Sequence, residues 1–437
     1  MKYSFNGIIT SYKKYKIPFN ISDSQIRFNV SSLPDEEVRE NKYKGVEING
    51  RISSFSEEFF EGKTNDGKLI KIHARGIYDD KYVFDYSGKY LFGFAISCIV
   101  LDQNKFKSNI DKIGFYSLDI SKITNISISG AIDFKTLLSL GKNLSIANFT
   151  CNDNQYYLNI DFLNKIPFCS QQIITVSSTA NLTTKMLEDI YYVMKKMFIF
   201  AYQEKEVPLL DVLLFEGEEK VGHLFIEKES EKQTFEIDHH CLGIGSWNEK
   251  ASSLLQALSD NKIYLRHLPL IKKDKTMYTP SRFLITVVGL ESVLNEIGIK
   301  TNHKEKHKLA IENIQNTIKK HLETASGYEK KEYKRLLEIL SDERFEDKVL
   351  VAINENKDYI SNFFLLSTIG KTNEEIANLI AKSRNYFAHG YLDEELNNKH
   401  VQICNFLDLF ILYLQLLQIG FDKSEASQIV PLVLFGY

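Results

Sequence analysis

Arg384, Asn385 and His389 are the residues of this 437-residue chain whose types and spacing best suit chemistry on a phosphodiester. Arginine carries a permanent planar charge that matches phosphate oxygens, and histidine has an ordinary pKa that lets it accept and release protons near neutral pH. RNA supplies its own nucleophile, the 2′-hydroxyl. A ribonuclease therefore has to add only a proton acceptor, a proton donor and stabilisation of the phosphorane charge, and Arg384 and His389 are the candidates for these roles.

The segment that carries these residues is predicted to be a well-started helix, residues 373–389. Thr372 followed three positions later by Glu375 has the spacing of a capping box. Apolar residues then follow at helical spacing, beginning with Ile376. The pattern places the candidate residues near the end of a helix whose beginning is specified by its own sequence.

The spacing within the motif decides which side chains share a face. Asn385 and His389 are four residues apart and share one, so Asn385 is a candidate to orient His389 or a phosphate, whereas Arg384 lies about 100° around the helix from Asn385. Gly390 follows directly and is expected to loosen the helix end. A long arginine side chain could then reach the same polar corner, although a solvated helix face with an ordinary histidine would satisfy the same spacing.

Composition sets limits on the partners of the chain. The formal charge of -3 and the pI near 6.4 exclude a uniformly basic nucleic-acid-binding protein, so any RNA contact needs a local basic patch. A lysine-rich stretch in the C-terminal third could provide one. Its candidates are Lys304, Lys308, Lys319 and Lys320. Because glutamates are interleaved with these lysines, a solvated helix face is an equally good interpretation.

Cysteine usage and hydropathy favour a cytoplasmic protein that has no metal, cofactor or membrane segment. The five cysteines are scattered, without paired spacing for zinc or for a disulfide framework. The apolar runs at residues 91–101 and 406–421 are respectively too short and too interrupted to span a bilayer. Asp238 and His240 could share one face of a strand as metal ligands, but ordinary polar residues are the simpler interpretation.

Residues 1–270 are predicted to form a β-rich N-terminal domain with a mixed α/β second half. Short β-branched and aromatic runs alternate with Gly, Asn and Asp, as in a sandwich-like pair of sheets, and residues 82–93 have a hairpin pattern around Ser87-Gly88. From residue 179 the pattern becomes mixed. Helices are expected at residues 182–203 and 247–258, with apolar strands at residues 209–215 and 222–226.

Residues 278–437 are predicted to form an all-helical domain after a charged boundary at residues 272–276. Thr279 followed by Pro280 is a strong helix start, and Gly298 is a helix stop. No clear strand pattern interrupts the helices that follow. They are expected at residues 303–322, 328–340, 343–355, 357–369, 373–389 and 395–419. The predicted fold class is therefore α+β, with a β-rich N-terminal domain followed by a helical bundle.

The order of these parts, together with the Arg-Asn-x3-His pattern at Arg384 to His389, resembles the HEPN superfamily and its Apea-like branch of bacterial antiphage proteins. The resemblance covers the layout of the whole chain but only residues 384–390 as a motif. It implies a metal-independent endoribonuclease that acts as a dimer, with transfer RNA as the target in phage-infected cells. Glu291, in the first helix of the bundle, is a supporting candidate that could pair with Arg384.

Dimerisation would be part of such a mechanism, because one histidine cannot act as base and acid in the same step. Two facing motif helices would supply two histidines and two arginines to one cleft, and the products would be a 2′,3′-cyclic phosphate and a 5′-hydroxyl. The alternative is a non-catalytic sensor or scaffold. In that case the β domain binds a ligand, such as a phage component, and the bundle only associates.

Overall fold

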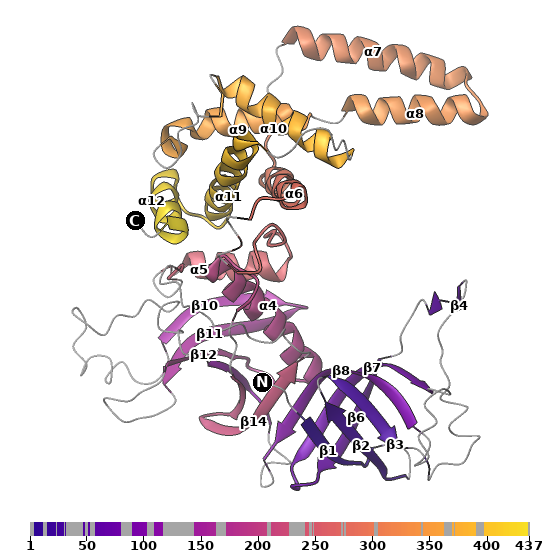
Figure 1. Ribbon diagram of the computed structural model, residues 1–437, viewed down its shortest axis with the longest axis vertical. Helices are drawn as coiled ribbons and strands as arrows, with labels where there is room; N and C mark the ends of the chain where they lie inside the picture. Colours follow the sequence, from indigo (N-terminus) through magenta and orange to yellow (C-terminus); the bar gives the residue numbers. More distant parts are fainter. Residues whose placement is uncertain are drawn as a thin grey trace, which may run out of the picture. The chain divides into compact units, whose positions relative to one another are not determined.

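A computed structural model gives the fold of residues 4–435, except for residues 12–14, 23, 30, 32–46, 49–50, 53–56, 80–89, 103–108, 117–143, 163–171, 208–210, 227–240, 244–246, 248, 272–273, 275–276, 301–304, 342–343, 362–368, 371 and 390–396 (Figure 1). The chain forms two compact units. Residues 1–201 with 207–260 make the first, and residues 202–206 with 261–437 make the second. The predicted hairpin at residues 82–93 falls largely outside the described residues. The predicted division into domains 1–270 and 278–437 stays a prediction.

The first unit is built mainly of antiparallel strands. These are β1 (Ser4–Ile9), β2 (Ile17–Ser22), β3 (Gln25–Asn29), β4 (Glu47–Ile48), β5 (Arg51–Ile52), β6 (Glu57–Thr64), β7 (Leu69–Asp79), β8 (Tyr90–Leu101), β9 (Lys112–Tyr116), β10 (Leu144–Cys151), β11 (Asn154–Phe162), β12 (Gln172–Ser177), β13 (Asp211–Glu216) and β14 (Glu219–Ile226). All except the β4–β5 pair belong to one sheet, in the order β10-β11-β12-β9-β13-β14-β8-β3-β2-β1-β6-β7.

One end of this sheet closes on itself, because β7 at its edge also pairs with β8. The ring therefore runs through β8, β3, β2, β1, β6 and β7. Side chains alternate along its strands as the β period requires, so that Ile17, Phe19 and Ile21 of β2 are buried while the residues between them are exposed. Gly7 of β1 makes the close crossing with β6 possible, since a Cβ there would lie 2.0 Å from the Lys63 carbonyl oxygen.

The other half of the sheet continues from the ring through β8. Along one edge of β8, residues 90–94 pair with β3 and residues 97–101 pair with β14. One long strand thus serves both halves. The β-rich character of this region is confirmed, but its strands form one continuous sheet where the sequence favours two stacked sheets. The pairing of β8 with three neighbours is the reason for the difference.

Helices α4 (Thr184–Tyr202) and α5 (Glu249–Ser259) pack on this second half. The Phe115 ring of β9 contacts Tyr191 and Phe198 of α4, with ring centroids 6.5 and 6.3 Å apart. Gln256 of α5 binds the backbone of Thr150 in β10, with contacts of 2.9 and 3.2 Å to its N–H and carbonyl. These contacts fix both helices against the strands.

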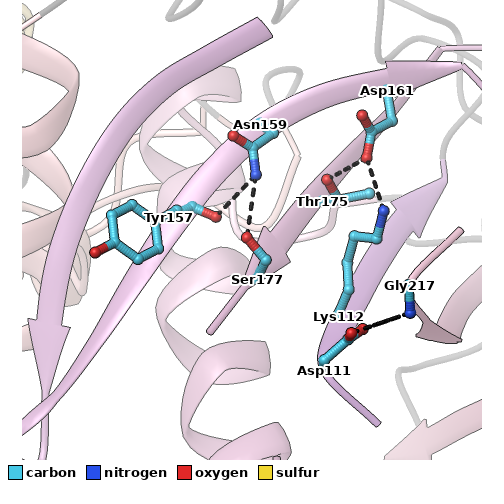
Figure 2. Close-up of polar contacts among 8 residues, drawn as sticks. All are labelled: Asp111, Lys112, Tyr157, Asn159, Asp161, Thr175, Ser177 and Gly217. Carbon is cyan, nitrogen blue, oxygen red and sulfur yellow. Dashed lines mark hydrogen bonds and ion pairs between the residues drawn. The ribbon is translucent and has the colours of Figure 1, made fainter. Parts of the chain in front are cut away.

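Polar side chains of β9, β11 and β12 satisfy one another on the sheet (Figure 2). Asp161 accepts a hydrogen bond of 2.7 Å from the Thr175 hydroxyl and lies 3.5 Å from the Lys112 ammonium. Asn159 donates to the Ser177 hydroxyl at 3.3 Å. Thr175 is 1% exposed, so these bonds replace water contacts that the group loses on folding.

A second polar cluster joins the ring of strands to α4. Oε1 of Glu188 on α4 lies 2.7 Å from Nδ1 of His73 on β7, and the Ser97 hydroxyl of β8 donates to the same oxygen at 2.5 Å. All three residues are buried, at 2% exposure or less. The His73 ring also stacks on Phe59 at 4.2 Å. Because a buried carboxyl is costly without partners, this cluster determines how α4 sits on the strands.

The second unit is helical. Its helices are α6 (Pro280–Ile297), α7 (Glu305–Thr324), α8 (Gly327–Ser341), α9 (Phe345–Ile360), α10 (Asn373–Ala388), α11 (Asn398–Gln418) and α12 (Lys423–Phe435). Helix α10 packs against α6 and α9, α11 packs against α6 and α12, and α12 packs against α9. A β-rich region followed by a helical region confirms the predicted α+β class.

Local chemistry starts the helices where the sequence predicts. The Thr279 hydroxyl accepts the Arg282 N–H at 3.1 Å with Pro280 in the first turn, and Gly298 ends α6 at a φ of 71°. The Thr372 hydroxyl accepts the Glu375 N–H at 3.2 Å and starts α10. These bonds satisfy backbone groups that a helix terminus leaves without partners.

Helix α11 is the core of the second unit. Among the described residues it is the one helix long and apolar enough to cross a membrane by length and composition, and 72% of that window is buried inside the protein. Asp408 on this helix binds Arg282 of α6 at 2.7 Å, and Tyr413 donates to Asn356 of α9 at 3.1 Å. Its apolar surface is thus used in packing the other helices.

Candidate functional site

Arg384 lies on α10 and faces the neighbouring helix α6. Its Nη2 atom is 3.0 Å from Oε2 and 3.4 Å from Oε1 of Glu291. The two side chains are 36% and 32% exposed. Ion pairs as exposed as this one contribute little to stability because water screens them. The main effect of Glu291 is therefore to orient the guanidinium, and the predicted pairing of Glu291 with Arg384 is present.

Two further groups surround the Arg384 guanidinium. Its Cζ lies 5.7 Å from the centre of the Phe345 ring, the first residue of α9, within the range of a cation–π contact. Its Nη1 donates to Oδ1 of Asn385 at 3.4 Å. Side chains from α6, α9 and α10 thus meet at one arginine, which remains accessible to a ligand.

His389 lies at the end of α10. Its backbone N–H donates to the Asn385 carbonyl at 3.1 Å, and its φ of -88° and ψ of 0° mark the C-cap. Both Asn385 and His389 are exposed. The helix therefore ends after Ala388, as expected from the motif, while Gly390 itself lies outside the described residues. A histidine at this position can meet a substrate without any rearrangement of the core.

An aromatic cluster beneath the motif holds this end of α10 in place. The Phe387 ring lies 5.2 Å from that of Phe283 on α6 and 5.1 Å from that of His400 on α11. Phe387 is 8% exposed and His400 is 7% exposed. Between exposed Asn385 and exposed His389, Phe387 thus points into the core and fixes the register of the motif.

His400 has a structural role that differs from that of His389. Its Nδ1 accepts the Asn397 N–H at 3.3 Å, and the Asn397 side chain accepts the His400 N–H at 3.3 Å. This reciprocal pair caps the first turn of α11. Sequence reasoning missed His400 and Phe345. An Asn three residues before a His is a readable cap signal, whereas nothing local marks Phe345 as a neighbour of Arg384.

The remaining candidates lie elsewhere or outside the described residues. Lys319 and Lys320 are exposed on α7 and are not among the contacts of Arg384 described above. Lys304 lies outside the described residues, and the side chain of Lys308 is not described. Asp238 and His240 are also outside. In the part of the chain that the structure describes, no three His, Cys, Asp or Glu side chains are grouped so as to hold a metal ion.

The buried thiol near the bundle core is not a nucleophile candidate. Cys404 of α11 lies 3.9 Å from the Thr286 hydroxyl of α6 and is 2% exposed. Burial raises the pKa of the Cys404 thiol to about 12, and the neighbouring Asp408 carboxyl adds to the shift. Since the thiolate is the reactive form, Cys404 is inert near neutral pH.

Comparison with known proteins agrees with the geometry. Residues 286–425 match the family described as Apea-like HEPN. No curated protein and no solved structure matches the chain. The match begins within α6, ends in the first turn of α12 and includes all the candidate residues of the site. Domains of this family are generally ribonucleases, which supports a nuclease-type role in defence. Residues 286–425, about a third of the chain, are therefore similar to the Apea-like HEPN family.

Proposed function

We propose that the protein is a metal-independent endoribonuclease of antiphage, abortive-infection defence, which cleaves RNA by attack of the 2′-hydroxyl on the adjacent phosphate. The observation that carries the proposal is the arrangement at the end of α10. Arg384 is oriented by Glu291 at 3.0 Å yet is 36% exposed, and His389 is exposed one helical turn after Asn385. The oriented charge and the accessible imidazole are the groups that this reaction needs.

Each group has a defined task in the proposed reaction. Arg384 binds the phosphate and stabilises the charge that accumulates on its oxygens, a contribution that is often the largest in such reactions. His389 transfers the proton, either from the attacking 2′-hydroxyl or to the leaving 5′-oxygen, and Asn385 orients His389 or the phosphate. A positioned acid or base contributes roughly 10²- to 10⁴-fold. The products carry a 2′,3′-cyclic phosphate and a 5′-hydroxyl.

A homodimer completes the site in this proposal, since base and acid must act together. The exposed face of α6 supports it. Ile285 and Val288 are 41% and 43% exposed and lie about two turns and one turn, respectively, before Glu291 on the same helix. Apolar side chains beside a polar site suit a contact with a second copy, which would bring two motif helices to one cleft. Replacing both with Glu is expected to give a monomer without activity, measured by light scattering and cleavage.

Transfer RNA in the cytoplasm of a phage-infected cell is the proposed target, and a phage-derived ligand at the β-rich region is the proposed trigger. The test is cleavage of a transfer RNA pool in excess chelator by wild type and His389→Ala, with analysis of the product ends. His223→Ala, a partly exposed histidine of β14, is the matched control. We expect wild type and the control to leave cyclic phosphates and His389→Ala to lose activity.

Other results would contradict the proposal. Equal cutting by wild type and His389→Ala would place the chemistry elsewhere. Protection of cells from phage by His389→Ala, without any loss of RNA, would favour the alternative, a non-catalytic sensor or scaffold with a dimerising bundle.

A further inference from the structure

The α7–α8 hairpin, residues 305–341, is a local positive region on an acidic chain. Residues 319–335 around its turn contain six Lys and Arg against three Glu, a net of +3, whereas the whole chain carries -3. Two of the three glutamates are engaged along α8 itself. Glu329 accepts the Tyr333 hydroxyl at 3.3 Å, and Glu332 lies 3.8 Å from Arg335. The positive charge around the turn is therefore in excess.

The side chains of the hairpin face solvent. The two helices lie side by side and contact each other, with the His321 and Tyr333 rings 6.0 Å apart (Figure 1). Of the residues of α7 and α8 whose burial is described, none is buried. Lys319, Lys320, Lys330 and Lys331 are all exposed. The hairpin is thus not part of the hydrophobic core, and its basic side chains are accessible.

The chain enters and leaves the hairpin from elements that touch Arg384. Helix α6 carries Glu291 at 3.0 Å from the guanidinium, and α9 begins at Phe345, whose ring centre is 5.7 Å from Arg384. The hairpin is therefore inserted between two contacts of the candidate site. The 20 residues of α7 span about 30 Å at ~1.5 Å per residue. An RNA that touches both Arg384 and the turn must be longer than a few nucleotides.

An aromatic side chain stands among these cations. Tyr328 follows the turn at Gly327 and is 77% exposed. Exposed aromatic rings between basic side chains are the usual means by which proteins hold single-stranded bases, because every base can stack on a ring while lysines contact the backbone. Because Tyr328 is 77% exposed, most of its side chain is available to a ligand.

We propose that the α7–α8 hairpin is an RNA-docking arm, in which Lys319, Lys320, Lys330 and Lys331 contact phosphates and Tyr328 stacks on an unpaired base. The proposal rests on the proposed ribonuclease function, because it gives the substrate a second anchor outside the cleavage site. Charge complementarity with the phosphate backbone selects RNA as the occupant. Ile314 and Leu336, 48% and 44% exposed, would instead favour a second copy of the chain, and the experiment separates the two occupants.

The test measures binding of a transfer RNA pool by the full-length protein with His389→Ala, as a function of salt. Adding Lys330→Gln and Lys331→Gln removes two phosphate contacts. This should reduce the slope of log affinity against log salt by about 1.4 for single-stranded contacts. Tyr328→Ala should weaken binding by about 5- to 150-fold. Lys63→Gln with Lys185→Gln, two exposed lysines of the first unit, is the matched control and should change neither quantity.

An unchanged salt slope for the Lys330 and Lys331 variant would overturn the proposal. So would a loss of dimer mass for Ile314→Asp with Leu336→Asp while RNA binding stays intact, since that result assigns the hairpin to a second copy. Cleavage of an oligonucleotide too short to reach the turn tests the ribonuclease function independently of the docking arm. The arm variants on the wild-type background should cleave this oligonucleotide at the wild-type rate. If wild type cuts no RNA, the ribonuclease function fails, and the binding result still decides the role of the arm.

Discussion

Two glutamates of this protein, Glu188 and Glu291, each hold a basic side chain, but their surroundings differ. Glu188 on α4 binds His73 at 2.7 Å and Ser97 at 2.5 Å, and all three are buried at 2% exposure or less. Glu291 on α6 binds Arg384 at 3.0 Å, and both side chains are about one third exposed. Geometry alone would make either cluster a candidate for catalysis.

Exposure separates their roles. The Glu188 carboxyl has His73 and Ser97 on the same oxygen and no solvent-facing side, so its bonds stabilise the position of α4 on the strands. Arg384 keeps an exposed fraction that a phosphate can occupy, and exposed His389 follows on the same helix. A polar cluster that is buried away from solvent is thus part of the fold, whereas one that is oriented but accessible can bind a substrate.

The largest effect should come from breaking the buried cluster. Glu188→Ala leaves His73 and Ser97 without their shared acceptor in an apolar surround, and removing one partner of a buried pair costs about 3 to 5 kcal/mol. Trp247 is the chain's single tryptophan and is 9% exposed in the first unit, so its fluorescence reports unfolding of that unit. We expect the urea midpoint of this unfolding transition to be much lower in Glu188→Ala than in wild type.

Glu188→Gln is the matched variant, since it keeps the shape and one carbonyl acceptor. It should lose less stability than Glu188→Ala. If Glu188→Ala unfolds at the wild-type midpoint, the cluster is not structural and the comparison between the two glutamates fails.

The next largest effect should come from the accessible Arg384–Glu291 cluster, and it should change the cleavage rate without changing stability. Arg384→Ala removes one oriented cation from the phosphate, a loss of about 10²- to 10³-fold in rate by analogy with single charge-stabilising donors. Its free energy of unfolding should stay within about 0.5 kcal/mol of wild type. Arg266→Ala, another exposed arginine of the second unit, should change neither. Loss of folding together with activity would contradict this assignment.

Much of the candidate site could be predicted from local sequence. The spacing of Asn385 and His389, the cap at Thr372 and the start at Thr279-Pro280 depend only on residues within one turn, and the structure has these helices. The partner Glu291 was also a prediction. Phe345 could not be predicted, because its contact with Arg384 depends on how α9 packs against α10. That packing is a property of the whole bundle.

A smaller effect should follow from Glu291→Gln, which weakens the orientation of Arg384 but leaves the arginine in place. A charge-assisted hydrogen bond contributes about 1.5 to 3 kcal/mol when well protected. Since this pair is one third exposed, we expect about a 5- to 10-fold loss, close to 1 kcal/mol. Glu296→Gln, an exposed glutamate on the same helix, is the control. Cleavage rates decide the outcome, and equal losses for both variants would show that Glu291 has no specific role.

The helices and sheets differ in how well the sequence predicts them. The prediction that one helix ends at residue 355 and the next begins at residue 357 was wrong, because α9 continues to Ile360. Asn356, the residue between the two predicted helices, is 4% exposed and accepts the Tyr413 hydroxyl at 3.1 Å. Helix α12, which contains Pro431, was not predicted. The closed ring of strands also could not be foreseen, since the pairing of β7 with β8 and of β3 with β8 joins segments whose register no local pattern fixes.

The effect that is smallest near neutral pH should be a pH dependence of stability above about pH 9, from a buried group that takes no part in the chemistry. The pKa of the Cys404 thiol is raised from 9 to about 12 by burial, so the folded protein keeps this proton after the unfolded chain has lost it. Stability from this group is fully present below about pH 9 and is lost as pH rises towards 12, by at most ~1.4 kcal/mol per pH unit. Urea unfolding at several pH values, followed by helical circular dichroism, should show a shallower decline for Cys404→Ala. An identical decline for both proteins would mean that the thiol is accessible in the folded state. In that case the distinction between buried structural groups and accessible functional ones would fail within the bundle itself.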